Sequence, residues 1–568
     1  MKSKTLPIYE SIEYANVREM LEDCATRYPD RIAFSYRARP QDNAPIRVPF
    51  PTFRDHIRAL GTELLTRGMK GRKVALIGKL SYPWVCTFFS LLSIGAVVVP
   101  LDRDWSAEEL AKTASYADCE FLFCDPALAQ KGEAVARAIG IDSYVALTPD
   151  KDAIGACVET LLSLGREKLE EGERAYFQNP LKPQDPAFLI FTSGTTGSGK
   201  GVMLSQNGLM ADLYAGLKRV KLSRKTIAVL PPHHTYGCNV GLVAHVAAGC
   251  EVYLSDGLRY VQREMREEQP EHLTLVPLFV ETFYRRILST AKDQGKDKLL
   301  RRMMKVSNAA RKLGIDVRRS LFSSILSSFG GKLRLVISGG APISQEILDT
   351  FDAIGITVIN GYGITECSPL IAVTHQAAPV AGSVGKPLAC NKVRLREPNA
   401  EGEGEICVRG ANVMMGYYKD DEATERAFDE DGYFRTGDFG KFDRDGNLYI
   451  TGRLKNLIIL SNGKNVYPEE IEKEFLSLPA VLEIVVYEGQ SRRGVEQNAI
   501  VAEIYPNRDY LAKIGVEDEQ SYFRQAVEDY NKTAVAYKKI GRMKIRREEF
   551  PKNTLRKILR YRLDMTID

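Results

Sequence analysis

Short apolar runs alternate with helical patterns between residues 72 and 342. The runs at residues 72–79, 96–102 and 119–125 are separated by segments with apolar residues at helical spacing, one after Tyr82 and one after Ser106. This order predicts a β-α-β-α-β unit with a parallel sheet. The same alternation continues with further apolar runs at residues 226–232, 250–255, 272–277 and 332–342. A second α/β layer is therefore expected.

The pattern changes after Val384, where short β-like runs with glycine turns replace the longer alternation. Residues 404–410 and 445–453 predict a small antiparallel barrel or sheet. Beyond them, strands and helices mix in an α+β tail. We therefore expect an α/β plus α+β fold. A large region, residues 1–453, would hold two α/β subdomains and a small β-barrel, followed by a smaller α+β domain, residues 454–568.

One uncharged stretch has the length of a membrane span. The segment from Trp84 to Leu101 contains 18 residues without a charge. Gly95 divides it into a helical half and a β-branched half that ends at Pro100. A buried helix followed by a buried strand is therefore favoured over a span.

Composition excludes several classes of protein. Hydrophobic residues make up 44% and charged residues 27% of the chain, as in ordinary soluble proteins. A net charge of +5, from 78 basic and 73 acidic residues, does not indicate a nucleic-acid partner. The ten cysteines and six histidines show no disulfide or metal-ligand spacing. The first thirty residues are acidic and lack an apolar core, so we expect no signal peptide and a cytoplasmic location.

A glycine-rich loop carries candidate chemistry, in the sequence FLIFTSGTTGSGKGVM at residues 188–203. The segment from Thr192 to Lys200 gathers backbone amides, hydroxyls and an ammonium group, as anion sites do. Gly201 stands where a P-loop needs a Ser or Thr for Mg²⁺, and the following apolar run predicts a strand instead of a helix. We expect a hairpin tip that binds phosphate. An exposed Gly/Ser loop without a ligand is the open alternative.

Four further motifs follow in order. Residues 360–368 (NGYGITECS) offer an aromatic ring and a carboxylate, Glu366, that suits Mg²⁺. Residues 433–440 (YFRTGDFG) offer Asp438 for ribose hydroxyls. The set is completed by GRLKNLIILSNGKNVYPEEIE at 452–472 and PKNTLRKIL at 551–559. With these motifs, from about residue 20 to Leu559, the chain resembles the adenylate-forming, acyl-activating superfamily of acyl-CoA synthetases, luciferases and nonribosomal peptide adenylation domains.

The resemblance implies where ATP and Mg²⁺ would bind. Thr365 and Glu366 would contact the α-phosphate and Mg²⁺, with Glu366 as the metal ligand. Tyr362 would stack on adenine, while Asp438 and Arg453 would hold the ribose. The set expected to bind ATP is Thr192, Ser193, Gly194, Thr195, Thr196, Gly197, Lys200, Gly339, Gly340, Ala341, Tyr362, Gly363, Asp438 and Arg453.

The resemblance also implies a reaction in two steps. An acid attacks the α-phosphate and pyrophosphate leaves; a thiol such as coenzyme A then attacks the acyl-adenylate and AMP leaves. Between the steps the mobile domain 454–568 would swing about a hinge at Lys455, and Lys557 would act in the first step. Two positions depart from the family pattern: Arg556 replaces a glycine, and Asn456 replaces an acidic residue beside the hinge.

The motif HHTYG at residues 233–237 borders the acid pocket in this family, and His234 is its candidate catalytic or substrate contact. A packed histidine without such a role is the open alternative. Amino-acid-activating members place an aspartate just after this motif, but Cys238 and Asn239 offer no carboxylate. An apolar acid is therefore favoured, and the apolar residues 274–283 suit an alkyl tunnel. The motifs look most like those of bacterial fatty-acyl-CoA synthetases.

The acceptor and other partners stay open at this stage. The basic C-terminal residues suit the phosphates of coenzyme A or the acidic face of an acyl carrier protein. The basic segment 285–319 suits either contact with anionic lipid at the inner face of the membrane or an ordinary solvated face. Nucleic acid is disfavoured because few aromatic residues interleave with the charges. A luciferase and a non-catalytic membrane scaffold with a degenerate ATP site are weaker alternatives, since no S-K-L address is present and the reacting positions are filled.

Overall fold

A computed structural model describes residues 6–150, 156–192, 200–340, 343–459, 465–489, 499–553 and 556–566. The chain divides into two compact units. The first comprises Met1–Lys392 and Val408–Phe434, and the second comprises Val393–Cys407 and Arg435–Asp568. This division falls before the expected boundary between residues 453 and 454. The expected boundary is the point about which the smaller domain would rotate between two conformations, and it stays a prediction.

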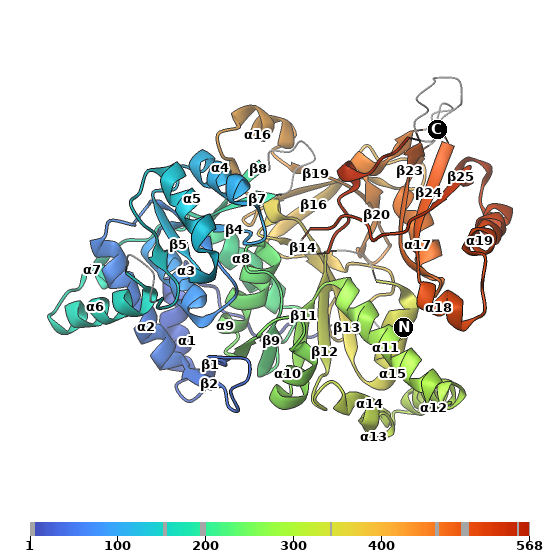
Figure 1. The fold of residues 1–568 in the computed structure, drawn as a ribbon, viewed down its shortest axis with the longest axis horizontal. Helices are drawn as coiled ribbons and strands as arrows, with labels where there is room; N and C mark the ends of the chain where they lie inside the picture. Colours follow the sequence, from blue (N-terminus) through green and yellow to red (C-terminus); the bar gives the residue numbers. More distant parts are fainter. Residues whose placement is uncertain are drawn as a thin grey trace. The chain divides into compact units, whose positions relative to one another are not determined.

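The largest sheet of the first unit has seven strands in the order β18-β8-β7-β4-β3-β5-β6. Its strands are β3 (Lys73–Ile77), β4 (Val97–Leu101), β5 (Phe121–Cys124), β6 (Val145–Ala146), β7 (Pro186–Thr192), β8 (Lys200–Ser205) and β18 (Gly416–Tyr417). β3 pairs in parallel with both β4 and β5, and helices α3 (Tyr82–Ile94) and α4 (Ala107–Tyr116) provide the crossovers. The predicted β-α-β-α-β unit is confirmed (Figure 1).

The uncharged segment 84–101 is a helix followed by a strand, as predicted. α3 ends at Gly95, whose φ of 77° is the left-handed conformation that glycine adopts without a steric penalty. All five residues of β4 are buried. Among the described residues, no helix combines the length and the apolar character needed to cross a membrane.

The second α/β layer is divided between two sheets, ordered β2-β1-β10-β9 and β11-β12-β13-β14-β15. Their strands are β1 (Ile32–Tyr36), β2 (Ile46–Pro49), β9 (Lys225–Ala228), β10 (Glu251–Leu254), β11 (His272–Leu275), β12 (Leu335–Gly339), β13 (Thr357–Gly363), β14 (Leu370–Val373) and β15 (Lys386–Pro387). β10 pairs with the distant β1, where Phe34 lies opposite Val252. Local periodicity does not contain such long-range pairing.

In the described part of the first unit, sixteen helices accompany these sheets, and a π-helix, Tyr236–Val243, precedes α9. Besides α3 and α4 they are α1 (Val17–Arg27), α2 (Phe50–Thr66), α5 (Ala129–Ile139), α6 (Val158–Glu170), α7 (Ala175–Gln178), α8 (Gln206–Leu217), α9 (Ala244–Ala247), α10 (Val261–Glu268), α11 (Pro277–Asp293), α12 (Asp297–Lys312), α13 (Arg318–Leu321), α14 (Ser323–Ser327), α15 (Gln345–Ile354) and α16 (Asp421–Ala427).

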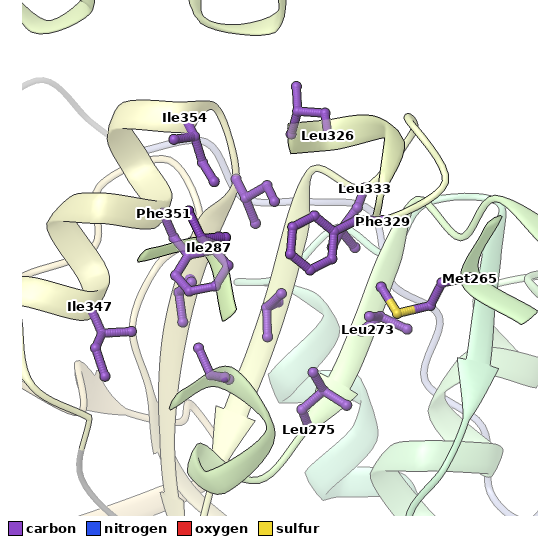
Figure 2. Close-up of a cluster of buried hydrophobic side chains, with 14 of the residues drawn as sticks. Met265, Leu273, Leu275, Ile287, Leu326, Phe329, Leu333, Ile347, Phe351 and Ile354 are labelled. Carbon is purple, nitrogen blue, oxygen red and sulfur yellow. The ribbon is translucent and has the colours of Figure 1, made fainter. Parts of the chain in front are cut away.

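A hydrophobic cluster fixes α10, α11, α14 and α15 against the five-stranded sheet (Figure 2). Leu273 and Leu275 come from β11, Ile287 comes from α11, and Phe351 comes from α15. All four are less than a tenth exposed, and burial of such a side chain contributes about 1.5–3 kcal/mol. The cluster therefore sets the positions of the strand ends that carry the candidate site.

Among its described residues, the second unit combines short sheets with three helices. Its strands, including three that begin or end in the first unit, are β16 (Asn391–Arg396), β17 (Gly404–Gly410), β19 (Phe434–Phe442), β20 (Leu448–Arg453), β21 (Ile458–Ile459), β22 (Asn465–Val466), β23 (Val481–Gly489), β24 (Ala499–Pro506) and β25 (Arg542–Ile545). Its helices are α17 (Pro468–Leu476), α18 (Arg508–Lys513) and α19 (Glu519–Thr533). β16-β17-β19-β20 form a four-stranded sheet. The α+β class is confirmed, but a closed barrel is not.

Candidate active site

The glycine-rich loop joins the two strands of an antiparallel hairpin, as predicted. β7 and β8 pair with Thr192 opposite Lys200 and with Phe191 opposite Gly201. The Thr192 hydroxyl donates to the Lys200 carbonyl oxygen at 3.5 Å. A strand follows the lysine, whereas a P-loop requires a helix there. The expected phosphate ligands Ser193, Gly194, Thr195, Thr196 and Gly197 lie outside the described residues.

Three side chains from separate segments of the first unit meet beside this hairpin. The ammonium nitrogen of Lys200 lies 4.2 Å from the centroid of the Tyr417 ring, which is a cation–π distance. The Tyr417 hydroxyl donates a 3.0 Å hydrogen bond to Glu366 Oε1. Burial and the neighbouring Glu366 carboxylate raise the pKa of Tyr417, so its hydroxyl remains a donor. A cation, a phenol and a carboxylate therefore form one connected set, the Lys200–Tyr417–Glu366 chain.

Backbone pairing brings Tyr417 to this position. β18 adds to the edge of β8, with Tyr417 opposite Val202. Three residues earlier, the Met414 amide donates to the Glu366 carbonyl oxygen at 2.8 Å. The segment 414–417 thus ties the β8 edge to the 3₁₀ turn Thr365–Cys367 that carries Glu366.

Gly363 ends β13, two residues before that turn, and its lack of a side chain has a packing reason. A Cβ built there would lie 1.9 Å from the Pro369 carbonyl oxygen, which is far inside van der Waals contact. The same carbonyl accepts a 2.9 Å hydrogen bond from the Ile364 amide. Close approach of two backbone segments accounts for Gly363 without a ligand, and its expected role in binding ATP stays a prediction.

A buried polar network, here called the Asp212 network, braces the segment that follows Glu366. Asp212, on α8, is 2% exposed. Its Oδ1 accepts hydrogen bonds from the Leu370 amide at 3.0 Å and from Asn412 Nδ2 at 3.2 Å. Its Oδ2 accepts a third, at 3.3 Å, from Asn239 Nδ2, which also donates to the Ser368 carbonyl oxygen at 2.6 Å. One carboxylate therefore links segments that are far apart in sequence, around the turn that carries Glu366.

Asp212→Ala is expected to lower the free energy of unfolding by about 2–4 kcal/mol, because it leaves buried N–H donors without an acceptor. Urea unfolding followed by circular dichroism measures this loss. Asp142→Ala is the matched control, since Asp142 is exposed and its loss should change stability by less than about 0.5 kcal/mol. Equal free energies of unfolding for the two variants would show that the Asp212 network does not stabilise the fold.

The residues expected around adenine lie at the ends of neighbouring strands. Gly339 closes β12, and Gly361 lies opposite it on β13. Gly340 has a φ of 95°, which favours glycine over other residues. Tyr362, also on β13, is 8% exposed. Ala341 lies outside the described residues. Stacking of Tyr362 on adenine stays a prediction.

Tyr236 fills the space beside Gly339. A Cβ on Gly339 would lie 3.2 Å from the Tyr236 ring. The Tyr236 hydroxyl lies 3.1 Å from two carbonyl oxygens, those of Leu275 and Ile337, and donates to them. The HHTYG motif is thereby joined to the ends of β11 and β12.

The two histidines of this motif lie against each other, with ring centroids 4.2 Å apart. His233 Nε2 lies 3.4 Å from Asp102 Oδ2. Burial and the nearby Arg103 lower the pKa of His233 to about 3. Its ring is therefore neutral at pH 7, and its contact with Asp102 is a polar contact without a formal ion pair. His234 is half-buried, and its contact with an acid substrate stays a prediction.

In the second unit, Asp438 and Arg453 face each other across β19 and β20. Arg453 Nε lies 3.0 Å from Asp438 Oδ1. Lys557 lies within the electrostatic reach of both: burial and Arg453 lower its pKa to about 8, against the opposing influence of Asp438. The structure pairs Asp438 with Arg453 and leaves Lys557 within the electrostatic reach of both, while the ribose-binding role of the pair and the catalytic role of Lys557 stay predictions.

The two departures from the family pattern have structural counterparts. Arg556 has a φ of 59°, the left-handed conformation that a glycine adopts more readily. Asn456 donates a 2.6 Å hydrogen bond to Glu469 Oε1. Lys455, the expected hinge residue, is exposed in the 3₁₀ turn Leu454–Asn456. Its function as a pivot stays a prediction.

The arrangement fits an Mg²⁺ ion held mainly by phosphate oxygens. Within the described part of the chain, no group of three or more His, Cys, Asp or Glu side chains could hold a metal ion. Mg²⁺ commonly takes one or two protein carboxylates together with substrate phosphates and water. Glu366, half-buried and held by the Tyr417 hydroxyl, would supply one such carboxylate.

Sequence reasoning did not single out Tyr417 or Asp212. Tyr417 lies 51 residues from Glu366, and no local pattern around Tyr417 indicates that the two side chains meet. Asp212 lies in a helical stretch, where an aspartate is expected on the solvated face. Each acts through a contact that exists only after the chain has folded.

Comparison with known proteins gives the family. A family model described as AMP-binding enzyme matches residues 21–418. Long-chain-fatty-acid–CoA ligase 5 of Rattus norvegicus is 31% identical to the chain, over 82% of the chain and 72% of that protein. Long-chain-fatty-acid–CoA ligase 1 of Homo sapiens is 30% identical, over 81% of the chain and 70% of that protein.

Solved structures agree in fold. ATP-bound MatB from Rhodopseudomonas palustris matches with a TM-score of 0.75 and 23% identity, over 96% of the chain and 97% of that structure. A Mycobacterium tuberculosis fatty acyl CoA synthetase matches with a TM-score of 0.65 and 24% identity, over 96% and 97%. The family match and the curated relatives together show that this chain belongs to the AMP-binding enzyme family.

Proposed function

We propose that the chain is an ATP-dependent fatty-acid–CoA ligase that works through an acyl-adenylate and releases AMP and pyrophosphate. The observation that carries the proposal is its similarity to long-chain-fatty-acid–CoA ligases, at 31% identity over 82% of the chain. The Lys200–Tyr417–Glu366 chain supports it, because adenylation needs positive charge and a metal-binding carboxylate beside the phosphates.

The first step requires two anions to approach each other. A carboxylic acid is ionised at neutral pH, so it needs positioning and charge neutralisation but no general base. Lys200 would neutralise phosphate charge, and Thr192 would add a hydroxyl at the same strand end. Thr365 and Glu366 would hold the α-phosphate and Mg²⁺, and the bound ion would neutralise charge that develops on the phosphates. The Tyr417 hydroxyl would keep the Glu366 carboxylate oriented.

Lys557 would supply a further cation in this step, and Asp438 with Arg453 would hold the ribose. Asp438 opposes the effect of Arg453 on Lys557. With a pKa of about 8, most Lys557 side chains are protonated at pH 7. The charge that the first step uses is therefore available at neutral pH and is lost in mild alkali.

The rate of acyl-adenylate formation is expected to fall as pH rises through about 8, because Lys557 loses its proton there. Lys557→Arg should move this alkaline fall to higher pH, since a guanidinium keeps its proton, even if its absolute rate is lower. Pyrophosphate release measured between neutral and alkaline pH gives both profiles. An unchanged alkaline limb in Lys557→Arg would assign the fall to another group.

The acid is proposed to be a medium- or long-chain fatty acid. Asn239, where an ammonium-binding carboxylate would be expected for an amino acid, instead donates to Asp212 and Ser368. A pyrophosphate-release screen of fatty acids of graded length, acetate and α-amino acids tests this assignment. Preferred turnover of an α-amino acid would contradict it, and release of ADP with orthophosphate would contradict adenylation itself.

Coenzyme A is the proposed acceptor, because the similar proteins are named as CoA ligases. Acyl carrier protein is the alternative, and the same screen with each acceptor separates the two. We propose that the enzyme works in the cytoplasm and meets the inner face of the membrane.

A further inference from the structure

We infer that the outer face of α12, together with Leu313 and Ile315 just after it, is a binding surface for bilayers that contain anionic lipid. This face of α12 is here called the basic face. It is separate from every residue assigned above to ATP, Mg²⁺ or the acid. The observations that carry the inference are its charge, its exposed aliphatic side chains and the contacts that fix which side of the helix faces outward.

The region is strongly basic. Residues 285–319 contain twelve Lys or Arg residues and three Asp residues, a formal excess of nine positive charges. The whole chain carries only +5, so the remainder is net negative. No acidic residue occurs between Asp297 and Asp316. A local field of this sign attracts an anionic surface.

Packing fixes the orientation of α12. Leu300 belongs to the hydrophobic cluster of the five-stranded sheet, and Met303 and Met304 pack against it. The Ser307 hydroxyl donates to the Ala353 carbonyl oxygen on α15 at 3.2 Å. In Figure 1, α12 lies beyond α15, away from strands β12 and β13. One side of the helix is thus buried, and the opposite side is the basic face.

One edge of the basic face carries a stripe of exposed aliphatic side chains. Leu299, Val306 and Leu313 are 51%, 60% and 80% exposed. They are seven residues apart, close to two helical turns, so they lie along one line of the helix. Ile315, just beyond the helix end, is 57% exposed. Isolated exposed aliphatic residues are ordinary, but an aligned set beside concentrated charge marks an interaction surface.

Exposed cations border this stripe. Those on the outer side of α12 are Lys298, Arg301, Arg302, Lys305 and Lys312. An amphipathic helix with Lys and Arg beside Leu and Val lies in the plane of a membrane interface, with its aliphatic side chains in the acyl region and its cations at the headgroups. The exposed side chains of the basic face include no aromatic residue that could stack on bases, so single-stranded nucleic acid fits less well.

Such a surface would serve the proposed function, because fatty acids partition into bilayers. An enzyme held on the membrane would take its acid from a concentrated source. This consequence rests on the proposed ligase activity, whereas the binding surface itself does not.

Cosedimentation of the full chain with vesicles tests the inference. The probes are vesicles of phosphatidylcholine alone and of phosphatidylcholine mixed equally with phosphatidylglycerol. We expect binding to the mixed vesicles, little binding to phosphatidylcholine, and weakening of the binding by added salt. Equal binding to both kinds of vesicle, or no binding to either, would overturn the inference.

Arg302→Glu with Lys305→Glu is expected to weaken binding to the mixed vesicles by at least about tenfold. Lys112→Glu with Arg137→Glu makes the same change in net charge at exposed positions on α4 and α5. That control should bind nearly as well as the unaltered protein. If both double variants lose binding equally, net charge and not the basic face is responsible, and the inference fails.

The aliphatic stripe is tested separately. Leu299→Ser with Val306→Ser should weaken binding by about tenfold or more, because two aliphatic side chains no longer enter the acyl region. Ile46→Ser with Leu258→Ser is the matched control, since these side chains are 47% and 56% exposed elsewhere. Equal loss in both pairs would overturn the role of the stripe. Tighter binding of the unaltered protein to single-stranded RNA than to mixed vesicles would overturn the choice of lipid.

Activity without vesicles distinguishes this inference from the proposed function. All four double variants should form acyl-CoA from a water-soluble medium-chain acid at the rate of the unaltered protein. Vesicle binding without ligase activity on any acid would contradict the proposed function and leave the lipid surface standing. Ligase activity without vesicle binding would contradict the lipid surface and leave the proposed function standing.

Discussion

Lys557→Ala is expected to slow acyl-adenylate formation by about a thousandfold, yet to convert chemically supplied acyl-adenylate to thioester at nearly the normal rate. A cation that meets two anions in the transition state contributes several kcal/mol there, and about 4 kcal/mol corresponds to a thousandfold change. Thiol attack has no such need for Lys557, because pyrophosphate has already left. Single-turnover assays of each half-reaction measure the two rates.

Two further variants sharpen this experiment. Lys539→Ala removes an exposed lysine from the same unit and should change neither rate by more than about twofold. Lys455→Pro should slow thioester formation and spare adenylation, because proline fixes φ at the expected hinge. If Lys557→Ala slows both steps equally, or if Lys455→Pro slows neither, the two-conformation mechanism does not apply to this chain.

Glu366→Gln is expected to lower the rate of adenylation by about a hundredfold to a thousandfold and to raise the Mg²⁺ concentration needed for half-maximal rate. Glutamine keeps the size of the side chain and can still accept the hydrogen bond from Tyr417, but it lacks the negative charge that holds the ion. Pyrophosphate release measured across a range of Mg²⁺ concentrations reports both effects.

Tyr417→Phe should show a smaller loss, about tenfold, because one hydrogen bond to the carboxylate disappears while the carboxylate remains. Glu422→Gln, on exposed α16, serves as the control for loss of a negative charge. An unaltered Mg²⁺ dependence in Glu366→Gln would show that Glu366 does not bind the metal ion. Equal effects of Glu366→Gln and Glu422→Gln would show that net charge alone is responsible.

The fold class follows from local pattern wherever packing agrees with it. The segment 84–101 became a helix and a strand because Gly95 permits a left-handed turn between them. The loop between Thr192 and Lys200 joins a hairpin because apolar runs flank it on both sides. The ordered motifs also identified the superfamily. Local pattern did not show that β9 and β10 form a separate sheet with β1 and β2, since strand partners are chosen across the whole chain.

The candidate site also has residues that the sequence indicated and residues that only the folded chain brings to it. The short motifs and the resemblance that they carry made Glu366, Asp438, Arg453 and Lys557 candidates, because each motif is a short stretch of the chain. The Asp438–Arg453 ion pair then follows from the antiparallel pairing of two adjacent strands. Tyr417 could not be identified this way, because it reaches Glu366 only through the addition of β18 to the edge of β8.

By itself the sequence determined the α/β and α+β regions, the hairpin and the family, since periodicity, turn residues and ordered motifs are local properties. Tertiary structure alone decided that Asp212 is buried beneath donors from three other segments, and that Tyr417 joins Lys200 to Glu366. It also decided which side of α12 is buried and which is left exposed. The physical reason is common to all three: a polar or amphipathic side chain takes its role from the groups that packing brings to it, and those groups are remote in sequence.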